Sequence, residues 1–195
     1  MKRFDAVVAR HDLSEHPFYV AWRAGKLPRE ALAVYAGDYA EFIGTIETGW
    51  RALGDHEHAA VEREHARLWD RFRDGVGSTV APPCAEARTL ADVAREAFSD
   101  PVTALGALYA FEAQQPKTAR SKLDGLLQHY ELPAGSTAYF RAHADDYGER
   151  DGLSRRASAL EPADVARAEA ACEATCRAMW TALDGVMVAS GIACV

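Results

Sequence analysis

Apolar side chains recur at steps of three and four residues along much of the chain, and this spacing limits the possible folds more than any other feature. In the clearest stretch, residues 29–53, the apolar positions are Leu32, Tyr35, Tyr39, Phe42, Ile46, Trp50 and Leu53. Such spacing places the side chains on one face of an amphipathic helix. Pro28 precedes the stretch, at a place where a helix tolerates proline. We therefore predict a long helix over residues 29–53.

Comparable patterns predict helices through the rest of the chain. The last one follows the start signals Pro162 and Asp164, and its apolar positions continue to Val186. Between the two, we expect helices near residues 57–75, 87–99, 102–114, 117–130 and 136–150. No two alternating β-branched runs flank an Asn-Gly or Asp-Gly turn, as a hairpin would require. The chain is thus predicted to form one all-α domain, residues 1–195, built as a bundle of seven or eight helices and at least ~60% helical.

Composition and charge narrow the class of protein. Of the 195 residues, 49% are hydrophobic and 26% are charged, which fits one globular domain and excludes wholesale disorder. The net charge of −7 argues against nucleic-acid binding, which needs a basic patch. No apolar run approaches the ~20 residues that span a bilayer, and Asp5 and Arg10 interrupt the N-terminal stretch before it could act as a signal peptide. We expect a cytoplasmic protein that binds neither nucleic acid nor membrane.

One predicted helix carries a pattern typical of metal sites. Helical bundles build two-metal centres from carboxylates and histidines, often with a Glu-x-x-His pair whose side chains share a face. Glu62 and His65 have this spacing, and Trp69 and Phe72 follow His65 by four and seven residues. His65 is therefore expected on the buried face. The alternative is a solvated face, because charged helices contain Glu-x-x-His by chance.

Two further residues are candidates because their neighbours are apolar. Glu112 ends the apolar run of residues 102–111, and burying an uncompensated carboxylate is costly. It needs a metal, a cation or a proton, and an ion pair with Lys117 or Arg120 is the alternative to a metal. His143 follows two aromatic residues by three and four positions, where a hydrogen-bonded core histidine is the alternative. We predict that His65, Glu112 and His143 converge on one interior site.

Three ordered stretches resemble a known family. The first, residues 16–39, begins His-Pro-Phe-Tyr-Val-Ala-Trp and ends Tyr-Ala-Gly-Asp-Tyr. The second, residues 108–126, contains Leu-Tyr-Ala-Phe-Glu-Ala-Gln-Gln-Pro and then Lys-Leu-Asp-Gly-Leu. The third, residues 138–143, is Ala-Tyr-Phe-Arg-Ala-His. They are similar to the CADD-like 4-aminobenzoate synthases, which belong with the haem-oxygenase-like di-iron oxidases and lie close to pyrroloquinoline-quinone synthase. The resemblance covers most of residues 5–150 and implies a haem-oxygenase-like fold.

The resemblance also implies a set of metal ligands. Three family ligands have direct counterparts, His65, Glu112 and His143. The family's carboxylate on the first of these helices lies seven residues before the histidine, where this chain has His58. Because the chain is shortened in this region, Glu62 and Glu57 are the candidates to replace that carboxylate. The resulting metal set is Glu62, His65, Glu112 and His143.

The chain departs from the family at two further ligand positions. The family's Asp and His, four and seven residues after His143, are replaced by Tyr147 and Arg150. Arginine stays protonated and cannot bind a metal. Asp146 and Glu149 each lie one residue away, which is about 100° around a helix, and could substitute only if the helix shifts or bulges. We therefore expect one intact metal position and an impaired second one.

Two residues tied to amine-transfer chemistry in the family also have counterparts. They are Tyr19 and Lys122. The ordinary alternatives are an aromatic packing residue for Tyr19 and a surface lysine with its stem packed down for Lys122.

The resemblance implies an oxygen-dependent non-haem iron oxidase that acts on a small amine, amino acid or aromatic precursor in cofactor or natural-product biosynthesis. One or two iron ions would bind, O₂ would be the co-substrate, and the small-molecule substrate would lie among Tyr19, Tyr35, Tyr39 and Phe111. One alternative is a metal-free oxidase or hydrolase of the pyrroloquinoline-quinone synthase or thiaminase II type, in which Tyr147, Arg150 and His143 bind an anion and transfer protons. Another is a non-enzymatic binding protein. The oligomeric state stays open, with a homodimer among the options.

Unequal iron occupancy is the prediction that follows from the replaced ligands. Tyr147 and Arg150 remove one negative charge, add one positive charge and delete two bonds, in an interior where charges interact more strongly than in water. Iron titration followed by Mössbauer spectroscopy should find a single tightly bound iron in the wild type and a gain in the Tyr147→Asp, Arg150→His double variant. Two coupled irons in the wild type would mean that Asp146, Glu149 or another group replaces the missing ligands.

Overall fold

The computed structural model describes residues 2–79 and 81–192. Helices make up 77% of these residues, and no strand occurs among them, which confirms the all-α prediction. In chain order the elements are α1 (Lys2–Arg10), a 3-10 turn (Leu13–Glu15), α2 (Pro17–Arg23), α3 (Arg29–Asp38), α4 (Ala40–Ala52), α5 (His56–Val76), α6 (Ala85–Ala97), α7 (Pro101–Glu112), α8 (Gln115–His129), α9 (Ala138–His143), α10 (Gly148–Ala157) and α11 (Pro162–Ala189).

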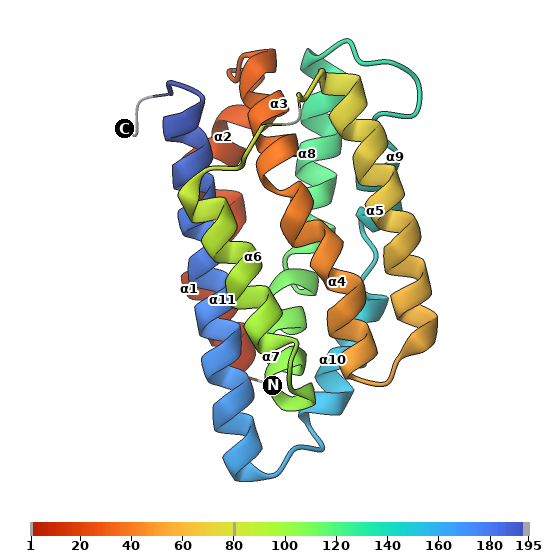
Figure 1. Ribbon diagram of the computed structural model, residues 1–195, viewed down its shortest axis with the longest axis vertical. Helices are drawn as coiled ribbons and strands as arrows, with labels where there is room; N and C mark the ends of the chain where they lie inside the picture. Colours follow the sequence, from red (N-terminus) through yellow and green to blue (C-terminus); the bar gives the residue numbers. More distant parts are fainter. Residues whose placement is uncertain (1, 80, 193–195) are drawn as a thin grey trace.

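The helices pack as a bundle around α7. The long helix α11 runs along the bundle and packs against both α6 and α7, while α4 packs against α5 (Figure 1). Because α7 is almost entirely apolar and is covered by its neighbours, every residue from Ala104 to Glu112 is buried. This central helix therefore carries Glu112 into the interior of the molecule.

Two predicted helices are divided in the structure, and two short N-terminal helices are added, so the described chain holds eleven α-helices rather than seven or eight. The predicted helix 29–53 bends at Tyr39, where backbone hydrogen bonds continue on both sides of the bend. The predicted helix 136–150 is broken outright. Asp145 has a φ of 64°, in the left-handed region, which ends α9 before α10 begins.

Local signals fix the ends of the helices that carry candidate residues. The Asp55 side chain accepts the backbone N–H of His58 at the start of α5, and Gly77 ends this helix in the left-handed conformation. The Asp100 side chain accepts two backbone N–H groups at the start of α7. These caps set where each helix begins and thus which face each candidate residue occupies.

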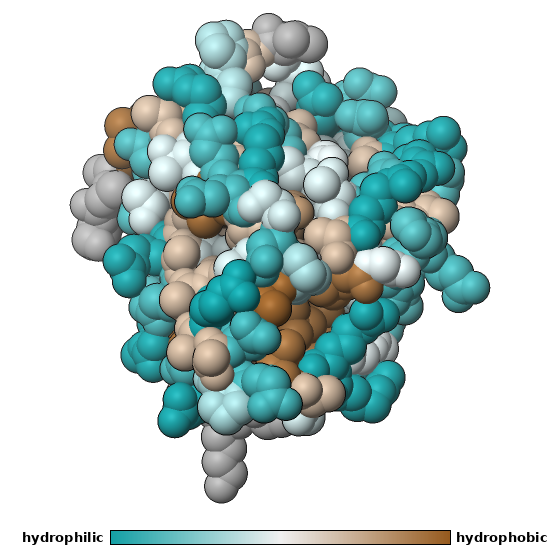
Figure 2. Space-filling model, turned by 60° about the horizontal axis from the view of Figure 1, so that its bottom comes forward, coloured by the Kyte–Doolittle hydropathy of each residue, from teal (hydrophilic) through white to brown (hydrophobic). Residues whose placement is uncertain are grey.

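Hydrophilic residues cover most of the lower end of the bundle, and hydrophobic residues show there mainly in a hollow (Figure 2). Among residues 2–79 and 81–192, no helix combines the length and the apolar character that crossing a membrane would need.

Gly106→Ala should destabilise the fold strongly, because α7 and α11 cross too closely for a side chain. A Cβ atom at Gly106 would lie 1.9 Å from the backbone oxygen of Ala168. We expect a loss of about 3 kcal/mol in the free energy of unfolding. The matched control is Gly44→Ala in α4, where an added Cβ meets nothing within 4 Å and should stabilise the helix by roughly 0.5–1 kcal/mol. Urea denaturation measures both, and equal effects would contradict the close crossing.

Candidate metal centre

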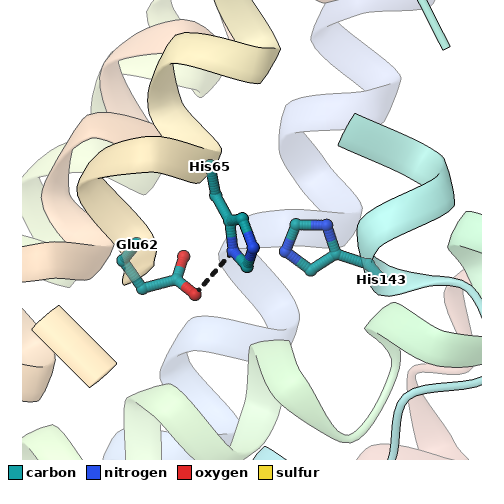
Figure 3. Close-up of side chains that lie close together, drawn as sticks. All are labelled: Glu62, His65 and His143. Carbon is teal, nitrogen blue, oxygen red and sulfur yellow. Dashed lines mark hydrogen bonds and ion pairs between the residues drawn. The ribbon is translucent and has the colours of Figure 1, made fainter. Parts of the chain in front are cut away.

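Glu62, His65 and His143 form the first half of a buried cluster. The first two come from the inner face of α5, His143 ends α9, and the three side chains point toward one another (Figure 3). His65 Nδ1 lies 2.9 Å from Glu62 Oε1, and the two imidazole centroids are 4.2 Å apart. One candidate ligand atom from each residue lies within 4.8 Å of the others. Ligand bonds of about 2 Å would let a single ion reach all three.

The orientation of His143 suits a ligand. Its Nδ1 lies 2.7 Å from the backbone carbonyl oxygen of Tyr139. A carbonyl oxygen can only accept, so Nδ1 carries the proton and donates it. Its Nε2 is buried and has no hydrogen-bond partner. Metal-binding histidines typically use one ring nitrogen in this way to fix the other. Burial, followed by the nearby His65 ring, lowers the pKa of His143 to about 4, so its ring is neutral and able to bind a metal near neutral pH.

Glu62 also belongs to a second group, with Glu112 and Glu149. One oxygen from each of the three carboxyl groups lies within 4.8 Å of the others. Glu112 is 2% exposed, and both of its carboxyl oxygens are buried without a hydrogen-bond partner. Burial, and then the charges of Glu149 and Glu62, raise the pKa of Glu112 well above its ordinary value. Burial and the charge of Glu62 raise the pKa of Glu149 to about 7.

The two groups together have the composition of a two-metal centre. Three carboxyl groups this close repel one another when ionised, so the site needs either protons or cations. Glu62 belongs to both groups, which would make it a shared ligand between a position with two histidines and a position with carboxylates alone. Oxygen and imidazole ligands suit iron and manganese. The unpartnered oxygens of Glu112 and the free Nε2 of His143 therefore fit metal ions.

The structure separates the candidates that the sequence left open around α5. Glu57 is exposed. His58 stacks on Trp50, with ring centroids 4.5 Å apart, and is not part of either group. Glu62, which is 3% exposed, is the carboxylate that faces His65.

Tyr147 and Arg150 do not face the cluster, because the helix predicted over residues 136–150 is broken at Asp145. Tyr147 is 45% exposed. Arg150 lies 3.3 Å from Asp5 of α1 and, with Tyr147, lines a surface groove of about 240 Å³. No positive charge therefore occupies the metal cluster from this position. Glu149, which the sequence admitted only if the helix shifted, takes a place in the cluster instead.

Lys122 and Tyr19 form a second buried cluster together with Tyr35. Lys122 is 4% exposed, which excludes the surface-lysine alternative. Its Nζ lies 3.4 Å from the Tyr19 hydroxyl and 3.3 Å from the Tyr35 hydroxyl, and these hydroxyls are 2.9 Å apart. Burial lowers the pKa of Lys122 to about 7 and raises the pKa of Tyr19. A neutral amine is thus accessible to Lys122 near neutral pH.

A small cavity adjoins the Lys122 cluster. The four aromatic residues predicted to hold the substrate all line it, together with Lys122, Trp69 and Tyr139. Its volume of about 10 Å³ corresponds to roughly one water molecule. Tyr139 also packs on His143, with ring centroids 4.3 Å apart, and its hydroxyl accepts from Gln115 Nε2 at 2.7 Å. The sequence gave Tyr139 no role beyond an aromatic neighbour, since only the packing of α9 on α5 and α8 brings it between the clusters.

Comparison with known proteins identifies the family of this chain. Residues 43–190 match the family described as iron-containing redox enzymes. The chain belongs to this family. A 4-aminobenzoate synthase from Nitrosomonas europaea is 30% identical to it, over 95% of this chain and 89% of the relative. The resemblance inferred from the three sequence stretches is thus confirmed.

Solved structures identify the fold. A TenA homologue from Pseudomonas syringae superposes with a TM-score of 0.83 at 14% identity, covering 96% of this chain and 92% of that one. A domain with a haem oxygenase-like fold from Shewanella denitrificans gives a TM-score of 0.81 at 18% identity, covering 96% and 91%. The predicted haem-oxygenase-like fold is confirmed.

Glu112→Gln should stabilise the metal-free protein at high pH. The pKa of Glu112 is higher in the folded state than in the unfolded state. Its protonated form therefore stabilises the fold fully at pH values below the unfolded-state pKa. This stabilisation is lost as the pH rises through the folded-state pKa. Glutamine keeps the shape and cannot ionise. Thermal denaturation in chelator should therefore give a higher Tm for the variant at about pH 8 and similar values at about pH 5. The exposed Glu131→Gln is the control, and a pH-independent difference for Glu112→Gln would contradict the reasoning.

Proposed function

We propose that this protein is an O₂-dependent non-haem iron oxidase that acts on a small amine, amino acid or aromatic precursor in biosynthesis, with 4-aminobenzoate as the first product to test. The observation that carries the proposal is the pair of buried ligand groups that share Glu62, in a chain of the iron-containing redox enzyme family. The named activity of the Nitrosomonas relative supports the choice of product.

Five residues would hold the iron. His65 and His143 belong to one position, Glu112 and Glu149 to the other, and Glu62 to both. Iron bound there would supply electrons and open coordination positions for O₂. The backbone carbonyl of Tyr139 keeps the His143 ring oriented, and the buried surroundings of Glu112 exclude water from the carboxylate side.

The Lys122 cluster would handle the amine. With its pKa lowered to about 7, Lys122 can accept or release a proton, or act as a nucleophile, near neutral pH. The hydroxyls of Tyr19 and Tyr35 keep their protons, because burial raises the pKa of both, and they can donate to a neutral amine. A substrate larger than water enters only when side chains around the cavity move, since the cavity measures about 10 Å³.

The placement of the assigned residues does not favour the metal-free alternative. It required Tyr147, Arg150 and His143 to act on one substrate. Tyr147 is exposed, and Arg150 pairs with Asp5 on the surface, whereas His143 is buried beside His65. These three side chains do not share a site.

Anaerobic loading with Fe(II), followed by exposure to O₂, tests the proposal. We expect tight iron binding, O₂ consumption and formation of an aromatic amine detected by mass spectrometry. Changing a residue that only hydrogen-bonds to a metal ligand typically lowers metal affinity roughly 10–100-fold. His143→Ala removes a ligand itself, so it should lower iron affinity at least as much. Lys122→Met should keep the iron and lose the product, while Lys117→Met, at an exposed lysine of the same helix, should change neither. Absence of tight iron in the wild type would overturn the proposal.

A further inference from the structure

The break between α9 and α10 decides which side chain reaches the carboxylate end of the cluster. On a continuous helix, residues four and seven positions after His143 would share its face, whereas Glu149, six positions later, would point about 240° around the axis. In the structure Glu149 lies with Glu62 and Glu112, and Arg150 points to Asp5 on α1. Because of the break, Glu149 faces the cluster and Arg150 faces away from it.

The geometry of the break depends on two neighbouring aspartates. Asp145 is the one residue other than glycine with positive φ among residues 2–79 and 81–192. Its carboxylate accepts from Arg120 of α8, with Arg120 Nε 2.9 Å from Asp145 Oδ2. Asp146 Oδ1 accepts the backbone N–H of Gly148 at 2.9 Å, where α10 begins. The first aspartate thus ends one helix and the second starts the next.

A separate observation, the unpartnered polar atoms of the cluster, also points to a metal ligand at the position of Glu149. Both oxygens of Glu112 and the Nε2 of His143 are buried and lack hydrogen-bond partners. A metal held by Glu62 and Glu112 alone would have few protein ligands, and Glu149 supplies a third. The family-like positions supply none, because they hold Tyr147 and Arg150 on the outer side.

We infer that Glu149 is the ligand that replaces the family's two missing ones, and that Asp145, held by Arg120, is the positioning residue that turns Glu149 inward. This inference rests on the proposed iron site and names the residue that completes its second position. The two positions remain chemically unequal, since one has two imidazoles and the other has carboxylates only.

Iron stoichiometry tests the ligand. Glu149→Gln should reduce iron from two ions to one in anaerobic Fe(II) titration, with loss of one of two distinct Mössbauer signals. The Tyr147→Asp, Arg150→His double variant should gain nothing over the wild type, contrary to the expectation from sequence alone, because its new ligands lie outside the cluster. Two retained irons in Glu149→Gln, or a gain in the double variant, would overturn the inference.

A matched pair of variants tests the positioning role. Asp145→Gly and Asp145→Ala both lose the ion pair with Arg120, but only glycine adopts positive φ without penalty. The left-handed conformation costs other residues roughly 1–2 kcal/mol, so alanine should weaken the second iron by about 5–30-fold relative to glycine and leave the first unchanged. Equal affinities for both irons in the two variants would show that Asp145 has no positioning role.

Hydrogen exchange on the metal-free protein keeps the inference testable if no iron binds. The amides of Asp145 and Tyr147 should exchange quickly between protected flanking helices, because the helical hydrogen-bond ladder is interrupted there. A protected continuous helix through residues 138–157 would overturn the inference even if iron binding, and with it the proposed function, had failed separately.

Discussion

The burial of the Glu112 carboxylate is the constraint on which the rest of the site depends. It stands at the end of an apolar helix that is covered on all sides, and neither oxygen has a hydrogen-bond partner. A charge in such a place must be neutralised by a proton or a cation, because the interior cannot solvate it. Glu62 and Glu149 lie close enough to increase the repulsion rather than relieve it. The fold therefore maintains an arrangement of carboxyl groups that a proton or a metal ion would stabilise.

The rest of the molecule is built to keep this arrangement in place. The close approach of α7 to α11 at Gly106 holds the central helix, and α5 presents Glu62 and His65 on the same inner face. Tyr139 then connects the metal end to the amine end, since its ring packs on His143 and lines the cavity that Lys122 also lines. One buried aromatic side chain thus separates a candidate redox site from a lysine with a lowered pKa. Such proximity is what a reaction that couples oxidation to amine chemistry would need.

Substitution at two implied ligand positions leaves a candidate metal cluster in the structure. The resemblance implies ligands at the positions of Tyr147 and Arg150, and a carboxylate from the start of α10, Glu149, lies in the candidate cluster. Because Asp145 adopts a left-handed conformation, the following helix restarts with a different face toward the interior. A change in the backbone between two positions can therefore bring a different carboxylate into a candidate ligand set, which position-by-position comparison does not detect.

The sequence by itself determined the all-α class and put Glu62 and His65 on one face of α5, because these follow from local periodicity of about 3.6 residues. The structure decided that this face is inward and that Glu62, not Glu57, lies beside His65. The sequence also singled out Glu112, since a lone carboxylate after an apolar run has few places to go. The tertiary structure decided the roles of Tyr147, Arg150 and Glu149. Periodicity predicts one continuous helix across residues 136–150, and the break is accompanied by a contact of Asp145 with Arg120 on α8. Contacts between segments distant in the chain leave no periodic trace, so their effect on which face turns inward appears only in three dimensions.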